Sequence, residues 1–527
     1  MRSVPLAMTW EMLRRGWWVL ALGALGANAL PVLLFTVLRH EGTLDPADQS
    51  QIIMNMVMVQ INVFVFGTAA YAALGSPARL YTFPVSTSSI IAWHLVLGML
   101  AVALELIAST AMLNAMFGLE WRLWGPALFA AVAMAAFQAA VWLTTEKSGW
   151  FLLAISVVSI GLCLWFKSLY GPTFSVPTHY WTEVTPAQVA TLLAIGIAAY
   201  VVGVYGVARN RCGQPPYSLG LLAWLERVFA GAPEGDLEFR DPIHAQLWFE
   251  WRKTGWAMPG IVGMGLFVAA FIWLIASRHA NSLVEGLTGG GALLSIAGCL
   301  AGFILGSVGR SDVDLQFGDF LATRPITSTE MARTILRTMA KSVLNAWMIW
   351  AATYLALRGI LWALKIDPGV TFPAELGWWF FPATLLGAWT GAGISAPLAL
   401  AGRATLVAIL LFGGITLFVG LVVFSKNVLS SQAQQYFAQG AAVALGTVFV
   451  GWTVGAFALA LRRGLIGWPT LYFAASVWVA LCALVAFIWT PHSAARLAIS
   501  ICVVGLLALS VAPLATAPLA VAWNRTR

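Results

Sequence analysis

Long apolar runs separated by short polar stretches dominate the chain. A membrane-spanning helix needs about 20 mostly apolar residues, because the hydrocarbon core of a bilayer is about 30 Å thick. The runs of this length are 17–38, 52–74, 89–113, 123–143, 149–168, 188–208, 257–277, 290–308, 335–361, 377–400, 404–425, 438–461, 467–490 and 495–522. The pattern predicts an all-α polytopic integral membrane protein with about 14 transmembrane helices.

The composition supports this fold class. Of 527 residues, 60% are hydrophobic and 9% are charged. Soluble domains are about 45–50% apolar and about 25% charged. These values exclude a soluble enzyme, a disordered chain and a nucleic-acid binder. The five cysteines are scattered without metal-ligand spacing, so no zinc site or disulfide framework is indicated.

The charge distribution predicts the orientation. With the N-terminus inside and the spans alternating, most of the 29 Lys and Arg residues fall on the inner side. Cytoplasmic loops of membrane proteins carry such an excess of basic residues. We therefore expect a multi-pass protein of the bacterial cytoplasmic (inner) membrane with both termini in the cytoplasm.

One motif occurs twice, each time directly before a predicted span. It reads Glu-x-x-basic-x-Gly-Trp at 11–17 and again at 250–256. In each case apolar residues at helical spacing precede or accompany the motif, which predicts an amphipathic helix in the membrane interface. The residues that the two copies share are Glu11, Arg14 and Gly16, and Glu250, Lys253 and Gly255.

A second motif also recurs, after the second span of each half of the chain. It reads Thr-x-Pro-(Val/Ile) followed by three hydroxyl residues, at 82–88 and at 323–329. Proline disfavours helix in the residue before it, and hydroxyl side chains cap the next helix. Thr327 and Glu330 have the spacing of a capping box. Its central residues are Pro84, Val85, Ser86 and Thr87, and Pro325, Ile326, Thr327 and Ser328.

Each motif alone is explained by interfacial anchoring or by an ordinary helix start. Their recurrence in the same order predicts two parallel six-helix repeats, which an axis along the membrane normal would relate. The predicted division is 1–212 for the first repeat, 213–240 for a cytoplasmic linker with an interfacial helix, 241–463 for the second repeat, and 464–527 for two additional C-terminal spans.

The order of these features resembles the permease subunit of type-2 family ABC exporters. The resemblance covers about 1–463 and rests on an interfacial helix, two spans, a turn with Pro-Val-Ser or Pro-Ile-Thr, and further spans. It implies that both turns form coupling helices on ATP-binding cassette subunits, two copies for a fused chain. It also implies that the residues of the first motif lie beside the same interface. The two extra spans and the fused halves depart from the usual six-span subunit.

The chain itself has no Gly-Lys dipeptide and hence no phosphate-binding loop of the Gly-x-x-x-x-Gly-Lys-(Ser/Thr) type. We therefore expect a transport subunit that is not an enzyme and binds no cofactor, with ATP and Mg on the partner. A largely apolar path favours a lipophilic or amphipathic substrate.

Glu105 is an acidic residue within a predicted span. A charged side chain at mid-membrane costs about 2.5–3.5 kcal/mol on insertion scales, so Glu105 is a candidate for the transport path. A hydrogen-bonded structural role is the equal alternative. Two other functions stay open: a secondary transporter driven by an ion gradient with Glu105 as its proton site, and a polytopic membrane transferase. The transferase would need an Asp/His cluster in a loop, and none stands out.

Overall fold

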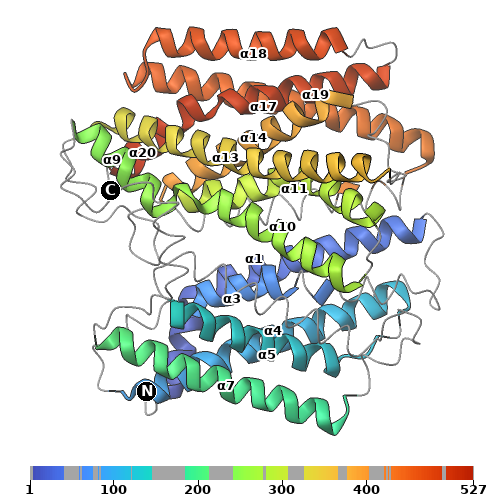
Figure 1. Cartoon of the computed structure of the whole chain (residues 1–527), viewed down its shortest axis with the longest axis vertical. Helices are drawn as coiled ribbons and strands as arrows, with labels where there is room; N and C mark the ends of the chain where they lie inside the picture. Colours follow the sequence, from blue (N-terminus) through green and yellow to red (C-terminus); the bar gives the residue numbers. More distant parts are fainter. Residues whose placement is uncertain are drawn as a thin grey trace. The chain divides into compact units, whose positions relative to one another are not determined.

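The structure is a computed structural model of the whole chain (Figure 1). The residues that it describes are 4–40, 58–59, 62–74, 81, 85–119, 121–144, 184–212, 241–276, 280–306, 326–365, 377–402, 421–422, 425, 429–488 and 494–525. Helices and turns account for this described part, which contains no strand. The all-α prediction is confirmed.

The chain divides into two compact units, Met1–Leu222 with Thr405–Ser430 and Ala223–Ala404 with Ser431–Arg527. Unit 1 holds α1 (Val4–His40), the π-helix η1 (Asn62–Phe66), α3 (Gly67–Leu74), α4 (Thr87–Phe117), α5 (Trp124–Thr144) and α7 (Pro186–Arg211). Unit 2 holds α9 (Pro242–Glu250), the π-helix η4 (Trp251–Gly255), α10 (Ala257–Ala276), α11 (Ala280–Gly306), α13 (Ser328–Ala363), the 3₁₀ turn η5 (Gly377–Trp379), α14 (Phe380–Leu400), α17 (Ser431–Arg462), α18 (Trp468–Ile488), α19 (Ala494–Val511) and α20 (Pro513–Arg525).

Nine helices in the described part are long and apolar enough to cross a membrane, and a bent pair raises the number to ten. The nine belong to α1, α4, α5, α7, α11, α13, α14, α17 and α18. The pair is α19 and α20, whose axes differ by 51°. Pro513 begins α20 and explains the break, because proline cannot continue the hydrogen-bond ladder of the preceding helix. The protein is thus a polytopic helical membrane protein, whereas the count of fourteen stays a prediction.

Several expectations lie wholly or partly outside the described residues. The predicted span 149–168 and the linker 213–240 are outside them, and so is most of 404–425. The run 257–277 is helical as α10, of which Ala257–Phe267 counts as a shorter apolar helix. The four-segment division of the chain and its repeat layout also stay predictions.

In unit 1, small residues bring α1 against η1 and α3 in antiparallel orientation. Gly16 lies against Ala73, and Gly23 lies against Ala69 and Phe66. A Cβ atom at either glycine would overlap the Cβ of the facing alanine, so the two helices pack at close range only because these positions are glycine.

Unit 2 contains a longer contact of the same kind. Along α11, every fourth residue from Gly298 to Gly306 is glycine, and these residues lie against the backbone carbonyls of Ala388, Ala392 and Ala396 in α14. Both series increase together, so α11 and α14 run parallel. Small residues at four-residue spacing are typical of helix pairs in membranes, where close packing replaces the hydrophobic effect as the driving force.

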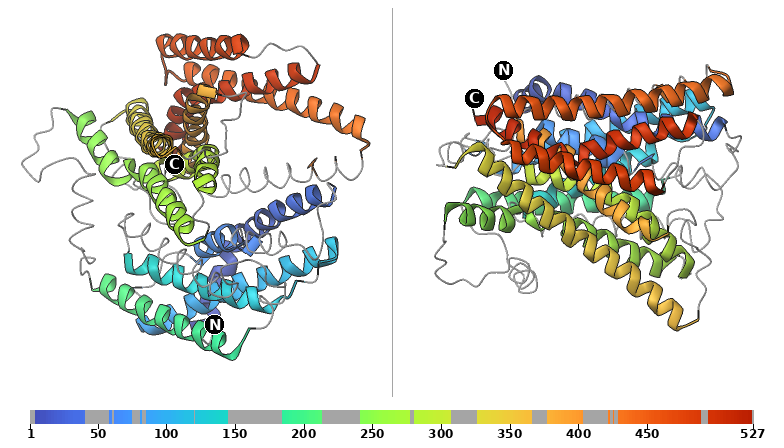
Figure 2. Two further views of the ribbon diagram at one scale, coloured as in Figure 1. Left: turned by 45° about the vertical axis from the view of Figure 1, so that its right-hand side comes forward. Right: turned by 90° about the horizontal axis from the view of Figure 1, so that it is seen from above.

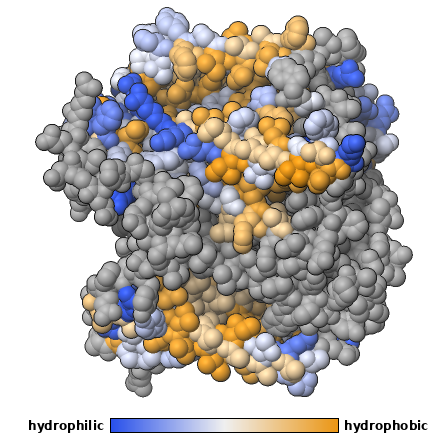
Figure 3. Space-filling view, viewed as in Figure 1, coloured by the Kyte–Doolittle hydropathy of each residue, from blue (hydrophilic) through white to orange (hydrophobic). Residues whose placement is uncertain are grey.

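The outward faces of the helices are apolar, as a lipid environment requires. Trp468, Phe473 and Phe487 on α18 are 61%, 63% and 86% exposed. Hydrophobic side chains cover much of the described surface in Figure 3. Figure 2 shows α17, α18 and the α19–α20 pair side by side in unit 2, consistent with their direct packing.

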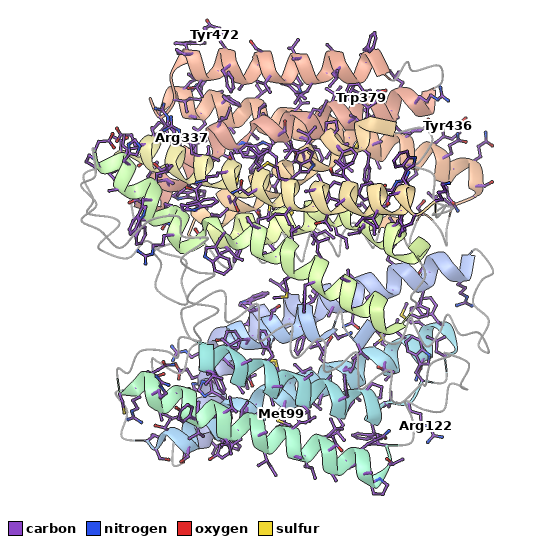
Figure 4. All side chains as sticks on the ribbon, in the orientation of Figure 1. Met99, Arg122, Arg337, Trp379, Tyr436 and Tyr472 are labelled. Atoms are coloured by element: carbon purple, nitrogen blue, oxygen red, sulfur yellow. The ribbon has the colours of Figure 1, made fainter. Side chains whose placement is uncertain are left out.

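Polar and aromatic residues mark the two ends of the helices in unit 2. Arg337 and Tyr472 lie toward one end, and Trp379 and Tyr436 lie toward the opposite end (Figure 4). Tyr436 near the start of α17 and Tyr472 near the start of α18 thus lie at opposite ends, as expected for consecutive antiparallel helices.

Candidate functional site: two capped turns and a half-buried acid

The first candidate turn ends in a capped helix start. Ser86 has an extended backbone, and its hydroxyl accepts a hydrogen bond from the backbone N–H of Ser89 at 3.3 Å. It is therefore the N-cap of α4, as the hydroxyl pattern predicts. Val85 and Thr87 flank it, and Pro84 lies outside the described residues.

Arg211, at the end of α7, holds this turn from the side. Its Nη1 donates to the carbonyl oxygen of Val85 at 3.0 Å and to the hydroxyl of Thr87 at 3.3 Å. Its Nη2 donates to the carbonyl oxygen of Tyr81 at 3.0 Å. Burial raises the pKa of the Tyr81 phenol, an effect that the positive charge of Arg211 opposes. One guanidinium therefore joins the residues on both sides of the proline to the end of a spanning helix.

The second turn also ends in a capped helix start, and here the cap consists of two reciprocal hydrogen bonds instead of one. The hydroxyl of Thr327 accepts from the N–H of Glu330 at 3.2 Å, and the Glu330 carboxylate accepts from the N–H of Thr327 at 2.9 Å. The capping box predicted from the spacing is present at the start of α13, directly before Ser328. Pro325 lies outside the described residues.

An arginine also holds the second turn. Arg525, at the end of α20, donates from Nη1 to the carbonyl oxygen of Ile326. Ile326 occupies the motif position of Val85, so both arginines bind the carbonyl of the residue after the proline. The turn between α17 and α18 adds a third connection, because the hydroxyl of Thr329 donates to the carbonyl oxygen of Leu465 at 2.7 Å.

The residue before each arginine makes a matching bond. Asn210 donates from Nδ2 to the carbonyl oxygen of Trp142 in α5 at 3.3 Å, and Asn524 donates to the carbonyl oxygen of Leu400 in α14 at 3.0 Å. In both units, an Asn-Arg pair in the last turn of α7 or α20 therefore joins that helix to the end of another helix and to the capped turn.

A sequence signal for this arrangement exists and our sequence analysis missed it. The ends of α7 and α20 read Val-Ala-x-Asn-Arg at 207–211 and again at 521–525. The second copy lies in 464–527, the segment predicted to have no counterpart in the first half. In the Asn-Arg contacts, α20 therefore corresponds to α7.

The two copies of the Glu-x-x-basic-x-Gly-Trp motif have different surroundings. Glu11 and Arg14 lie within the continuous helix α1, and the apolar side chains of Leu6, Trp10, Leu13 and Trp17 are all exposed. Exposure of this face fits an interfacial helix. Gly16 is buried against Ala73.

In unit 2 the second copy of the motif packs against α13, and its glutamate is buried. Glu250 is 1% exposed and accepts a hydrogen bond from Nε2 of Gln246 at 2.5 Å. The α9 and η4 helices pack against α13, where the ammonium of Lys341 lies 4.0 Å from the ring centroid of Trp251. Gly255 allows the Trp251 ring to lie over its backbone. The side chain of Lys253 lies outside the described residues.

Glu105 lies in α4 and has a partner that the sequence did not suggest. Nδ2 of Asn28 in α1 donates to its carboxyl oxygen Oε1 at 2.6 Å. The same Nδ2 donates to the carbonyl oxygen of Ala24 at 2.8 Å. Glu105 therefore has a neutral hydrogen-bond donor in place of an ion-pair partner. The structure does not bring it together with the capped turn, which is more than four helical turns away along α4.

Searches with protein-family models, among curated proteins and among solved structures returned no match to this chain.

Proposed function

We propose that the chain is the transmembrane subunit of an ATP-driven ABC exporter, in which separate ATP-binding subunits dock on the two capped turns. The main support is the set of hydrogen bonds that connects each turn to the helices around it. At each turn, an N-cap fixes the start of a candidate spanning helix, and an arginine fixes the residue after the proline to the end of another helix, α7 or α20.

A turn that is fixed to two helices in this way can transmit force from a partner to those helices. A partner that pushes on a flexible loop would deform the loop, whereas a push on a capped and bonded turn moves the helices that hold it. The proposal assigns Val85–Thr87 and Thr327–Ser328 to the docking surface, with Arg211 and Arg525 as positioning residues. The side chain of Ile326, which was predicted for the same surface, is buried in the core of unit 2. The chain then hydrolyses no ATP itself, and ATP and Mg are bound by the partner.

Site-specific crosslinking tests the proposal directly. A photoreactive residue at Ser86 or at Thr327 in cells should capture a protein whose peptides include a phosphate-binding loop. The matched control places the same residue at Gly118 or Lys365, at the opposite ends of α4 and α13, where no such capture should occur. Labelling of cysteines at the two turns from outside the cell, or robust ATPase activity of the purified chain alone, would contradict it.

A secondary transporter is the second candidate, and the Asn28–Glu105 bond favours it. A half-buried acid that is held by a neutral amide can take up and release a proton without breaking an ion pair. Reconstituted vesicles separate the two functions. Transport that follows an imposed proton gradient without ATP supports the second candidate, and transport that requires ATP and the partner supports the first.

A further inference from the structure

Two hydrogen-bonded pairs of polar side chains lie one helical turn apart along α4 in unit 1: the half-buried pair of Asn28 (α1) and Glu105 (α4), and the buried pair of Asn62 (η1) and Ser109 (α4). Asn28 donates to Glu105, and Nδ2 of Asn62 donates to the hydroxyl of Ser109 at 3.5 Å. We call this group the asparagine–glutamate cluster.

The antiparallel register of α1 explains why the two asparagines meet the same part of α4. Gly16 lies against Ala73 and Gly23 lies against Phe66, so the same register carries Asn28 to the level of Asn62. Glu105 and Ser109 are one turn apart on one face of α4. Asn62 is also the first residue of a π-helix, a distortion that is frequent at functional sites.

The cluster has more hydrogen-bond acceptors than donors. Each asparagine uses its Nδ2 twice: Asn28 bonds Ala24 and Glu105, and Asn62 bonds the carbonyl of Met58 and Ser109. Both amide N–H groups of each residue are therefore in use. The side-chain oxygens Oδ1 of Asn28 and Asn62 are buried and have no hydrogen-bond partner among the described residues.

Rotating the amides does not remove this imbalance. A flipped Asn28 would place its oxygen against the carbonyl of Ala24 and the carboxyl of Glu105, and a flipped Asn62 would place its oxygen against the carbonyl of Met58. The i−4 carbonyls thus fix the amide orientations, and the excess of acceptors is a property of the fold.

The surroundings determine the ligand that fits. Asn62 and Ser109 are each 1% exposed, and the neighbouring Phe35, Leu106 and Leu113 are buried and apolar. Buried acceptor oxygens without donors cost free energy unless water or a cation reaches them. Two amide oxygens, a hydroxyl and a carboxylate form an oxygen-only donor set, which suits hard cations. One carboxylate neutralises one positive charge, so a divalent ion would retain an uncompensated charge in the apolar core.

Charged groups do not compete at this site. The helices packed against α4 in unit 1 are α1, η1, α3, α5 and α7. Their ionisable residues in the described part lie toward helix ends, at Glu11, Arg14, Arg15, Arg39, His40, Arg209 and Arg211, apart from Tyr71, Tyr200 and Tyr205. On α4 itself, His94 is three turns before Glu105 and bonds the carbonyl of Ile90.

We propose that the asparagine–glutamate cluster binds one monovalent cation, either Na⁺ or a proton held as hydronium, between α1, η1 and α4. Both ions offer a single positive charge to the same oxygens. Cation binding here does not require either mode of transport, although Glu105 is also the acid of the gradient-driven candidate. It would fix three helices of unit 1 to one another when occupied.

Cation binding to the purified full-length chain tests this. In N-methylglucamine buffer at pH 8, ²²Na⁺ should bind with a stoichiometry of one per chain, and NaCl at constant ionic strength should raise the melting temperature. Glu105→Gln and Asn62→Leu should weaken Na⁺ binding at least tenfold. Gln138→Leu is the matched control, since Gln138 is fully buried in the same unit but lies against Gly98, outside the cluster.

The experiment that tests for a bound proton uses Na⁺-free buffer. If a proton is the ligand, lowering the pH from 8 to 6 should raise the melting temperature of the wild type and not that of Glu105→Gln. Asn28→Ala, which retains the carboxyl group, should shift this response. The proposal is overturned if neither Na⁺ nor pH separates the wild type from Glu105→Gln, which would mean that water alone fills the cluster.

Discussion

The guanidinium of Arg211 donates a hydrogen bond to the carbonyl oxygen of Val85, 126 residues earlier in the chain, at 3.0 Å. The same guanidinium also bonds Thr87 and Tyr81. A single side chain at the end of α7 therefore joins the first turn, and with it the start of α4, to α7.

Arg211→Leu should destabilise unit 1 and uncouple transport. Hydrogen bonds to charged groups contribute about 1.5–3 kcal/mol each, and this change leaves their carbonyl acceptors without a donor. Arg209→Leu is the control, since Arg209 bonds the exposed hydroxyl of Tyr205 at 3.5 Å and should matter less. Thermal unfolding in detergent and vesicle transport measure the two effects. Equal losses in both variants would show that the contact with Val85 has no special role.

Thr327→Ala should weaken the start of α13. Loss of an N-cap hydroxyl costs about 0.5–2 kcal/mol, and it also leaves the N–H of Glu330 without its acceptor. Thr327→Ser retains the hydroxyl and should behave like the wild type. Hydrogen exchange of the first turn of α13 is the measurement, and exchange that is equally slow in all three proteins would contradict the prediction.

Gly302→Ala should separate α11 from α14. A Cβ at this position would overlap the backbone of Ala392 and the hydroxyl of Ser395, and such overpacking costs about 1–3 kcal/mol. Gly289→Ala, in the same helix with nothing within 4 Å of its added Cβ, should leave stability unchanged or raise it by up to about 1 kcal/mol. The melting temperatures of the two variants are the measurement. A similar fall in both would show that close packing of α11 on α14 is not the cause.

Glu105→Gln should change transport more than folding. The amide retains the shape of the side chain and an oxygen that accepts from Asn28, but it removes titration. We expect near-normal insertion and thermal stability together with altered transport or an altered pH profile of transport. Unchanged transport at every pH, with Glu105→Ala lowering only the stability, would establish the structural role instead.

The cap of α9 should respond to acid. The backbone N–H of His244 donates to the carboxylate of Asp241 and lowers the pKa of that group. A lowered folded-state pKa stabilises α9 above the pKa of the unfolded state, about 3.9, and this contribution is lost as the pH falls through the folded-state pKa. Asp241→Asn retains a cap without titrating. Hydrogen exchange of α9 between pH 6 and 3 should show extra fraying in the wild type relative to this variant.

In the described part, apolar length alone predicted the nine helices that are long and apolar enough to cross a membrane. The runs 89–113, 123–143 and 188–208 correspond to α4, α5 and α7, and the structure extends each helix at one or both ends. Some helices also begin well before their apolar runs, as α13 does at Ser328 although its run begins at 335. Its first turns are amphipathic and capped by Thr327, so they stay helical without being apolar. Hydropathy does not report such an extension.

Apolar length and hydropathy could not predict the contacts between helices. Asn28 meets Glu105 because glycines set the register of α1 against α3, and no periodicity in either helix encodes that register. The bond of Arg525 to Ile326 was equally unpredictable, because in the sequence Arg525 is an ordinary basic residue after an apolar run. The recurring Val-Ala-x-Asn-Arg segment was the available signal, but it recurs at a different spacing from the other two motifs.

The bond between Arg525 and Ile326 joins residues 199 positions apart, and this separation orders the biogenesis of the protein. Arg211 precedes Ile326 in the chain, so the first turn has its arginine before the second turn has been synthesised. At about 5–20 residues per second, the ribosome needs about 10–40 s more to reach Arg525 after Ile326. During that interval a nascent chain has one completed turn and one open turn. A partner that recognises both would therefore assemble with the protein only after translation of α20.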